Sequence, residues 1–162
     1  MSEVIKVGMA DLKTCVSPNS VTTLGLGSCV GIAIRDTSNK IGGLAHIMLP
    51  DSKAMRNSQV NIAKFADTGI EELVRQMEAL GAKRSRMVAK IAGGADMFNF
   101  QGNSSIGLVG ERNAKATKEK LNELKIPILA EDIGANYGRT VIFYPETGEF
   151  HIRAVGKNVI II

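Results

Sequence analysis

The sequence contains few of the residues that several classes of function require. Only 4% of its 162 residues are aromatic and none is tryptophan, so a surface that stacks nucleic-acid bases is not expected. The net charge of +4 is too small and too scattered along the chain to indicate nucleic-acid binding. No apolar run approaches the roughly 18 residues that a membrane-spanning helix needs. These absences favour a globular protein.

Cysteine and histidine are also scarce, with two of each. The N-terminal residues MSEVIK lack the charged and then apolar order of a signal peptide, so we expect a cytoplasmic protein. In that compartment Cys15 and Cys29 are expected to be free thiols rather than a disulfide. The sequence has no CxxC or HExxH motif and no carboxylates at metal-ligand spacing, so neither a metal nor another cofactor is expected.

Hydrophobic patterning predicts an α+β fold with helices packed against β-sheets. Runs rich in β-branched residues predict strands at residues 4–7, 21–24, 30–35, 41–48, 87–91, 128–130, 140–144 and 150–155. Apolar residues three and four positions apart predict helices at 70–80 and about 111–124. The strands at 30–35 and 41–48 are expected to pair as a hairpin. Without a linker or an internal repeat, residues 1–162 are expected to form a single domain.

The strongest candidate site combines Cys29 with His46. Cys29 follows two glycines, Gly25 and Gly27, which permit a tight turn. Backbone N–H groups of this turn, around Gly27 and Ser28, could form an oxyanion hole. The predicted hairpin would bring His46 beside Cys29, where an imidazole can lower the pKa of a thiol by holding a thiolate–imidazolium pair. The residues alone also allow Cys29 to be a small buried apolar side chain, as most free cysteines are.

Three other motif interpretations of this region are weaker. A dinucleotide-binding fingerprint would need a third glycine where Val30 stands, followed by a helix. Residues 27–31 match the pattern G-x-nucleophile-x-G, with His151 as a conceivable partner, but that elbow needs a helix directly after the nucleophile and a strand is predicted there. The sequence signature of papain-like proteases is absent.

Four blocks of sequence together carry a family resemblance that covers nearly the whole chain. They are TLGLGSCV at 23–30, HIMLPD at 46–51, GGADMF at 93–98, and IG at 106–107 with RN at 112–113. In these blocks the chain resembles the CheD family, the chemoreceptor glutamine deamidases of bacterial chemotaxis. The resemblance implies an α/β sandwich with helices outside β-sheets, similar to deamidase toxins of the cytotoxic necrotizing factor type. It also implies a cysteine hydrolase that converts receptor glutamines to glutamates and releases ammonia.

The resemblance assigns roles to three residues. The nucleophilic cysteine of the family falls on Cys29, its histidine on His46, and the third polar member of its site on Thr23. Thr23 would orient the imidazole through its hydroxyl or its backbone carbonyl; without the resemblance it would be an ordinary strand residue. The implied substrate is the cytoplasmic helices of chemoreceptors. The alternative is a regulatory binding protein that stimulates a CheC-type phosphatase, a partner that the resemblance also implies.

Three remaining features are expected to lie outside the chemistry or leave two interpretations open. Cys15 matches none of the four blocks and is expected to be structural or incidental. His151 lies between two apolar strand residues, so alternation predicts that it faces solvent. Residues 93–98 form either a tight turn that closes the core or a wall of the substrate groove.

Overall fold

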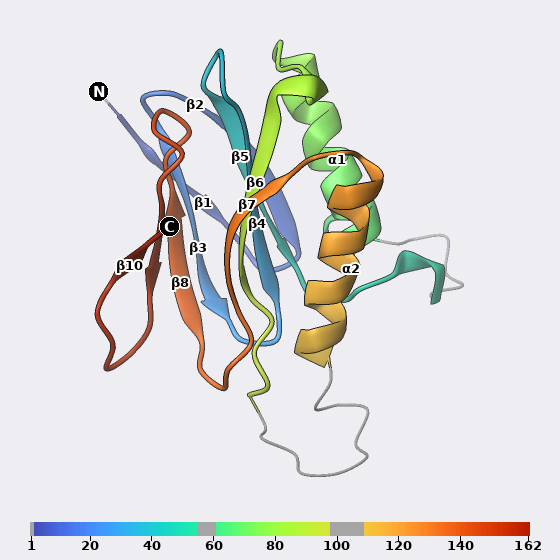
Figure 1. The fold of residues 1–162 in the computed structure, drawn as a ribbon, viewed down its shortest axis with the longest axis vertical. Coiled ribbons are helices and arrows are strands. Elements are labelled where there is room, and N and C mark those ends of the chain that lie inside the picture. Colours follow the sequence, from blue (N-terminus) through green and yellow to red (C-terminus); the bar gives the residue numbers. More distant parts are fainter. Residues whose placement is uncertain (1, 55–60, 98–108) are drawn as a thin grey trace.

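The computed structural model describes residues 2–54, 61–97 and 109–162, which form two five-stranded sheets and two α-helices in three layers (Figure 1). Sheet A has the strand order β1 (Val4–Val7), β3 (Ser20–Leu26), β8 (Arg139–Phe143), β9 (Phe150–Arg153) and β10 (Ile160–Ile161). Sheet B has the order β2 (Asp11–Val16), β5 (Ile41–Ile47), β4 (Val30–Asp36), β6 (Met87–Gly93) and β7 (Ile128–Ile133). This arrangement confirms the predicted α+β class.

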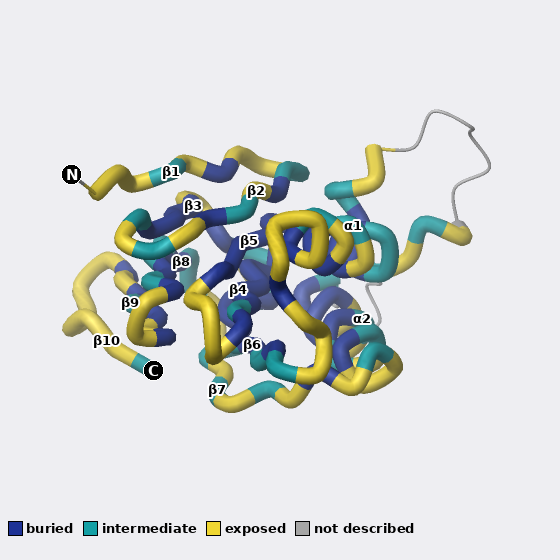
Figure 2. The backbone as a smooth tube through the Cα atoms, turned by 90° about the horizontal axis from the view of Figure 1, so that it is seen from above, coloured by how far each residue is buried: buried dark blue, intermediate teal, exposed yellow. Residues whose placement is uncertain are grey.

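Sheet B lies between sheet A and the helices, so it contributes to two hydrophobic cores (Figures 1 and 2). The core on its helix side includes Val30, Ile32 and Ile34 of β4 together with apolar residues of both helices. The core between the two sheets includes Ala33 and Leu44 of sheet B with Val141, Phe143, Phe150 and Ile152 of sheet A. A strand covered on both faces needs apolar residues on both, and every residue of β5 is buried.

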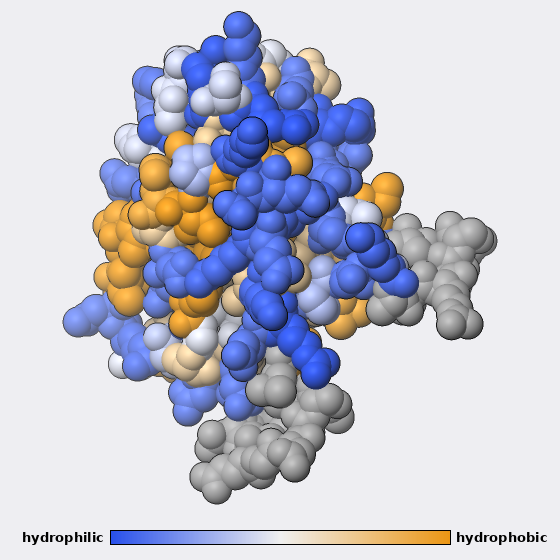
Figure 3. All heavy atoms as spheres, turned by 45° about the vertical axis from the view of Figure 1, so that its right-hand side comes forward, coloured by the Kyte–Doolittle hydropathy of each residue, from blue (hydrophilic) through white to orange (hydrophobic). Residues whose placement is uncertain are grey.

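The two helices bury the stripes that their spacing predicts. Helix α1 (Ala66–Ala79) buries Ile70, Leu73, Val74 and Met77, and the predicted stop at Gly81 is confirmed by its φ of +109° after the C-cap Leu80. Leu80, expected in the buried stripe, is half exposed because the helix has already ended. Helix α2 (Val109–Glu123) also lies close to its predicted range. The outer surface over the helices is mainly hydrophilic (Figure 3). Short 3-10 helices occupy Ser52–Ala54, Ile62–Lys64 and Arg84–Arg86.

Two of the ten strands in the described part of the chain were not predicted. Strand β2 pairs with β5 at the edge of sheet B, in a region that the composition presents as polar. Its only two buried residues face different cores, Leu12 the helix side and Cys15 the sheet A side, so no one-sided alternation appears. Strand β10 consists of two exposed residues. The hairpin of β4 and β5 is antiparallel as predicted.

The chain crosses from sheet A to sheet B between Leu26, the last residue of β3, and Val30, the first of β4. Strand β6 ends beside this crossing, because Gly93 pairs with Val30. After β6 the chain continues to α2 and then to β7, which is parallel to β6. Cys29 therefore lies at one end of the sandwich, where segments from both sheets and from α2 meet.

Candidate active site

The strand register directs Cys29 and His46 to the same face of sheet B. His46 on β5 lies opposite Gly31 on β4, and the two-residue repeat of a strand puts Cys29 on the face of Gly31. That face is turned toward sheet A, since a Cβ added to Gly31 would meet the Leu26 side chain at 3.0 Å. Cys29, with 8% of its surface exposed, belongs to the core between the sheets. The register thus makes the two residues diagonal neighbours across one strand pair.

Thr23 reaches His46 from the opposite sheet. His46 is fully buried, and its Nδ1 lies 2.6 Å from the Thr23 hydroxyl oxygen on β3. The same hydroxyl lies 2.8 Å from the backbone carbonyl oxygen of Val7, the strand partner of Thr23 on β1. Of the two possible contacts of Thr23 with the imidazole, the structure thus has the one through the side-chain hydroxyl.

These two distances define the tautomer of His46. A carbonyl oxygen can only accept a hydrogen bond, so the single hydroxyl proton of Thr23 is donated to Val7. The hydroxyl oxygen then accepts from Nδ1, which must carry the ring proton. Nε2 is left with its lone pair. It is buried and has no hydrogen-bond partner among the described residues. The imidazole therefore holds an unused acceptor nitrogen in the core that contains Cys29.

The electrostatics of the site favour neutral side chains. Burial raises the pKa of the Cys29 thiol, an effect that a hydrogen bond from its own backbone only partly opposes. Burial also lowers the pKa of His46. Both shifts disfavour the charged forms of the two side chains. The thiolate–imidazolium pair considered from the sequence is not supported by these environments.

In the loop that carries Cys29, three consecutive backbone carbonyl groups accept hydrogen bonds from neighbouring segments. Their donors are the Ala95 N–H to Gly27 at 2.9 Å, the Asn113 Nδ2 to Ser28 at 2.9 Å, and the Gly94 N–H to Cys29 at 2.8 Å. The close approach requires glycine at position 93, where an added Cβ would lie 2.2 Å from the Cys29 carbonyl oxygen. Residues 93–95 are therefore a backbone support for the Cys29 loop; Phe98 lies outside the described residues.

Gly27 and Ser28 differ in what their amides do. The Gly27 N–H donates to the Gly25 carbonyl at 3.0 Å, and Gly25 has a φ of +71° in the left-handed region. Gly27 therefore serves the turn, while the amides of Ser28 and Cys29 remain the candidates for an oxyanion hole. Gly27 also leaves room for Met97, because an added Cβ would lie 3.0 Å from its Cγ.

No role was predicted from the sequence for Asn113, although it belongs to the RN block at 112–113. It is fully buried in α2, and its Nδ2 contacts the carbonyl oxygens of both Ser28 and Met48 at 2.9 Å. A polar residue four positions before Thr117 and eight before Leu121, on the apolar stripe of the helix, is the signal that could have identified it.

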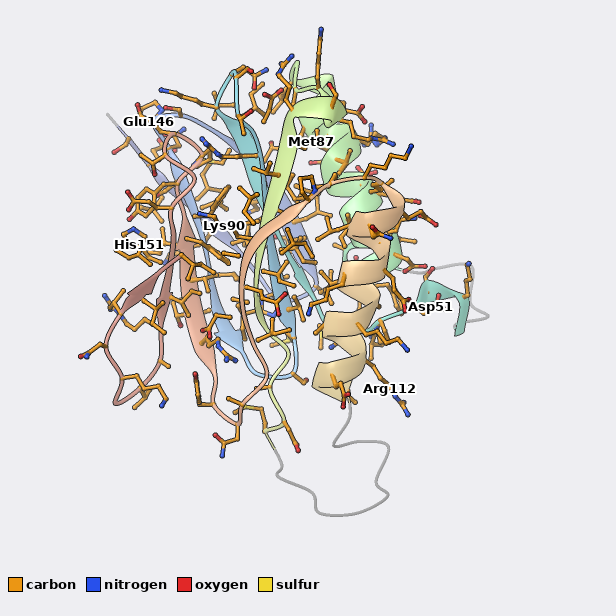
Figure 4. The ribbon with its side chains drawn as sticks, viewed as in Figure 1. Asp51, Met87, Lys90, Arg112, Glu146 and His151 are labelled. Carbon is orange, nitrogen blue, oxygen red and sulfur yellow. The ribbon has the colours of Figure 1, made fainter. Side chains whose placement is uncertain are left out.

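Cys15 and His151 lie apart from this site. Cys15 is buried in β2, and burial raises the pKa of its thiol to about 11. His151 on β9 is 28% exposed and contacts Glu149 at 2.8 Å. Figure 4 shows it on the side of sheet A that faces away from the helices. Its part-exposed position agrees with the predicted strand alternation.

Within residues 2–54, 61–97 and 109–162, no three His, Cys, Asp or Glu side chains gather where they could hold a metal ion. In the same part of the chain, no helix is long and apolar enough to cross a membrane.

The fold and the site define a class: a two-sheet α+β protein with a thiol, an imidazole and a hydroxyl gathered between its sheets. The sequence profile described as CheD chemotactic sensory transduction matches residues 48–154. The chain belongs to the CheD family.

Similarity to individual relatives extends over nearly the full length of the chain. The chain is 62% identical over 157 residues to a protein of Lachnoclostridium phytofermentans named probable chemoreceptor glutamine deamidase CheD, covering 97% of each. It is 51% identical over 158 residues to the chemoreceptor glutamine deamidase CheD of Halalkalibacterium halodurans, covering 98% of each. A Clostridium botulinum protein, also named probable chemoreceptor glutamine deamidase CheD, is 55% identical over 152 residues, covering 94% of this chain and 93% of the relative.

Proposed function

We propose that this chain, as one domain over residues 1–162, is a cytoplasmic protein-glutamine deamidase that acts on chemoreceptors with Cys29 as its nucleophile. The names of the full-length relatives support the substrate and the reaction. The observation that carries the mechanism is the unpartnered Nε2 of His46, on the same face of sheet B as Cys29.

The first half of the reaction forms a thioester. Nε2 of His46 takes the thiol proton as the sulfur of Cys29 attacks the carbonyl carbon of a glutamine side chain. The carbonyl oxygen becomes an oxyanion, which the amides of Ser28 and Cys29 stabilise. The C–N bond then breaks, His46 returns the proton to the leaving nitrogen, and ammonia departs. A neutral resting pair suits this order, since proton transfer accompanies attack.

The second half hydrolyses the thioester. His46, neutral again, removes a proton from water, whose oxygen attacks the thioester carbonyl. The tetrahedral intermediate collapses, the thiolate of Cys29 leaves and regains the proton, and the product side chain is glutamate. Thr23 keeps Nδ1 protonated throughout and so keeps Nε2 as the nitrogen that exchanges protons.

The test is intact-mass spectrometry of a purified chemoreceptor cytoplasmic domain incubated with the protein. We expect the small mass gain of amide-to-acid conversion at specific glutamines, with matching ammonia release. Cys29→Ala should give neither the mass gain nor the ammonia release. Cys15→Ala, if it folds, should give both. Conversion by Cys29→Ala would exclude Cys29 as the nucleophile.

The regulatory alternative makes a different prediction. If the protein converts no receptor glutamine but binds a CheC-type phosphatase tightly, with Cys29→Ala binding equally well, the site is a recognition groove and the deamidase proposal fails.

A further inference from the structure

We propose that Asn113 is a positioning residue that aims the Cys29 backbone N–H at the oxyanion of the reacting glutamine. The proposal rests on the deamidase function proposed above and adds to it a residue outside the Cys29–His46–Thr23 cluster. It assigns a reason for a fully buried amide side chain on the apolar stripe of α2.

The orientation of the Asn113 side chain follows from its two partners. Both the Ser28 and the Met48 carbonyl oxygens lie 2.9 Å from the amide nitrogen, and carbonyls accept hydrogen bonds only. An sp² amide nitrogen has two hydrogens, and each is donated to one carbonyl. The reversed orientation would place the Oδ1 acceptor against two other acceptors, so the network excludes it.

The contact with Ser28 fixes a peptide plane. In a trans peptide, the carbonyl of one residue and the N–H of the next point in opposite directions. The Ser28 carbonyl points toward Asn113 in α2, so the Cys29 N–H points away from α2. Helix α2 covers the face of sheet B remote from sheet A (Figure 1). The Cys29 amide is therefore turned toward the side on which His46 and Thr23 lie.

The contact with Met48 extends this control to His46. Met48 follows His46 by two residues in the chain, directly after the end of β5. One nitrogen of Asn113 thus joins the peptide before the nucleophile to the segment after the general base. The backbone donors at Gly94 and Ala95 hold the neighbouring carbonyls of Cys29 and Gly27, and neither reaches the Ser28–Cys29 peptide.

The Asn113 side chain has an unsatisfied atom. Its Oδ1 is buried and has no partner among the described residues. A buried acceptor without a donor destabilises the folded state. A leucine, whose side chain branches in the same way, would avoid this cost in a purely structural stripe, so the amide is best explained by what its nitrogen holds.

The test compares Asn113→Ala and Asn113→Ser with the unmodified protein, using kcat, KM and the rate of Cys29 alkylation by iodoacetamide. Alkylation is a displacement at carbon that forms no oxyanion, so it reports thiol reactivity without the proposed amide. We expect Asn113→Ala to lower kcat about 10²- to 10³-fold, as the loss of an oxyanion donor does. KM should stay within about twofold and alkylation within about threefold. Asn113→Ser, which keeps one donor, should be intermediate in kcat.

Thr117→Val is the matched control. Thr117 lies one helical turn from Asn113 on the same buried stripe, and its hydroxyl has no partner among the described residues. Replacing it should leave kcat within about twofold. A kcat for Asn113→Ala within about threefold of the unmodified value overturns the proposal, and so does an equal fall in kcat and alkylation.

Further measurements distinguish a failure of the Asn113 proposal from a failure of the variants to fold and from a failure of the proposed function. If neither Asn113 variant folds, NMR of the unmodified protein with a glutamine-aldehyde adduct on Cys29 decides: a downfield shift of the Cys29 amide proton supports the proposal and no shift overturns it. Loss of deamidation in Cys29→Ala together with full activity in Asn113→Ala refutes the role of Asn113 alone. Activity in Cys29→Ala refutes the proposed function itself.

Discussion

Buried polar groups are fully hydrogen-bonded at one end of strand β4 and partly unpartnered at the other. Asp36, the last residue of β4, is fully buried and accepts from both the Nε and Nη2 of Arg86, at 2.9 and 2.8 Å, and from the backbone N–H groups of Lys83 and Ser38. At the other end, about 20 Å away along the strand, the His46 Nε2 and the Asn113 Oδ1 are buried without partners among the described residues. Figure 4 labels Met87, the strand partner of Asp36, at one end and Arg112, next to Asn113, at the other.

Buried polar groups therefore serve different purposes at the two ends of one sheet. A carboxylate whose hydrogen bonds are all made contributes stability, because leaving it unpaired would be costly. An imidazole nitrogen kept without a partner is costly to the fold and available to a substrate or a thiol. The Asp36 end should therefore respond to mutation in stability, and the Cys29 end in activity.

The largest expected effect separates the two histidines of the chain. His46→Asn removes the proposed general base and should lower kcat about 10²- to 10⁴-fold. His151→Asn removes a part-exposed side chain on the outer side of sheet A and should leave kcat unchanged. Steady-state kinetics on a receptor fragment checks both. Equal losses in the two variants would contradict the location of the site.

At the other end, Asp36→Asn should reduce stability and not activity. It removes the charge paired with Arg86 and weakens the acceptors of two backbone amides, so we expect a loss of about 2–4 kcal/mol in the free energy of unfolding. Urea denaturation measures it. Glu146→Gln, in a half-exposed pair with Lys40 at 3.9 Å, is the control and should change stability by less than about 0.5 kcal/mol. A fall in kcat of the folded Asp36→Asn variant would contradict the expectation that the Asp36 end affects stability and not activity.

Acid should remove the same contribution in the unmodified protein. The hydrogen bonds of Asp36 lower its pKa to about 2, against the opposing effect of burial. As the pH falls through the ordinary aspartate range, the unfolded chain binds a proton before the folded protein does, so stability decreases toward pH 2. The stability difference between Asp36→Asn and the unmodified protein should therefore narrow in acid. A stability difference that stays the same at all pH values would contradict the lowered pKa of Asp36.

Thr23 tests whether the hydroxyl maintains the His46 tautomer. Thr23→Val keeps the shape and removes the hydroxyl, so the proton can move to Nε2 and the base is lost from part of the population. We expect kcat to fall about 10- to 100-fold, the equivalent of leaving one buried hydrogen-bonding group unpaired. Thr23→Ser should restore most of it. Equal activity of the valine and serine variants would exclude this role.

The pH dependence of kcat/KM should reveal a neutral pair. Because burial lowers the pKa of His46, activity should rise with pH along a limb below the ordinary histidine range, as the imidazole loses its proton. Because burial raises the pKa of Cys29, iodoacetamide alkylation should keep rising beyond the ordinary thiol range. An alkylation midpoint on the acidic side of neutrality would instead demonstrate a resting thiolate–imidazolium pair.

The sequence predicted those parts of the fold that depend on local patterns. The strands of the β4–β5 hairpin and the buried stripe of α1 are periodic over many residues. Strand β2 was missed because an edge strand with one residue in each core has no period to detect. The parallel pairing of β1 with β3 joins segments that no hairpin connects, and local patterns carry no information about it.

The site residues also differ in whether local sequence patterns could predict them. Cys29 and His46 could be proposed together because Cys29 directly precedes one strand of a predictable hairpin, His46 lies on the other strand, and histidines are so few. Thr23 was proposed only through the family resemblance, since its contact with His46 spans the gap between the sheets. The function of Asn113 depends on two backbone carbonyls, those of Ser28 and Met48, from segments distant in sequence. Every residue has a backbone carbonyl, so the residue types do not reveal which carbonyl accepts a hydrogen bond.

The smallest expected effect concerns a hydrogen bond between the middle of β6 and a turn of sheet A. The Lys90 Nζ of β6 donates to the Gly148 carbonyl at 2.7 Å, in the turn between β8 and β9. Lys90→Met keeps the packed stem and removes this bond, so we expect a loss of about 0.5–1.5 kcal/mol in the free energy of unfolding, with kcat unchanged. The value should fall in the lower part of this range, because burial and the nearby Arg35 lower the pKa of Lys90 and so already oppose its charge. Urea denaturation beside kinetics on a receptor fragment measures both quantities. A loss of activity would show that this contact between the sheets is coupled to the Cys29 site.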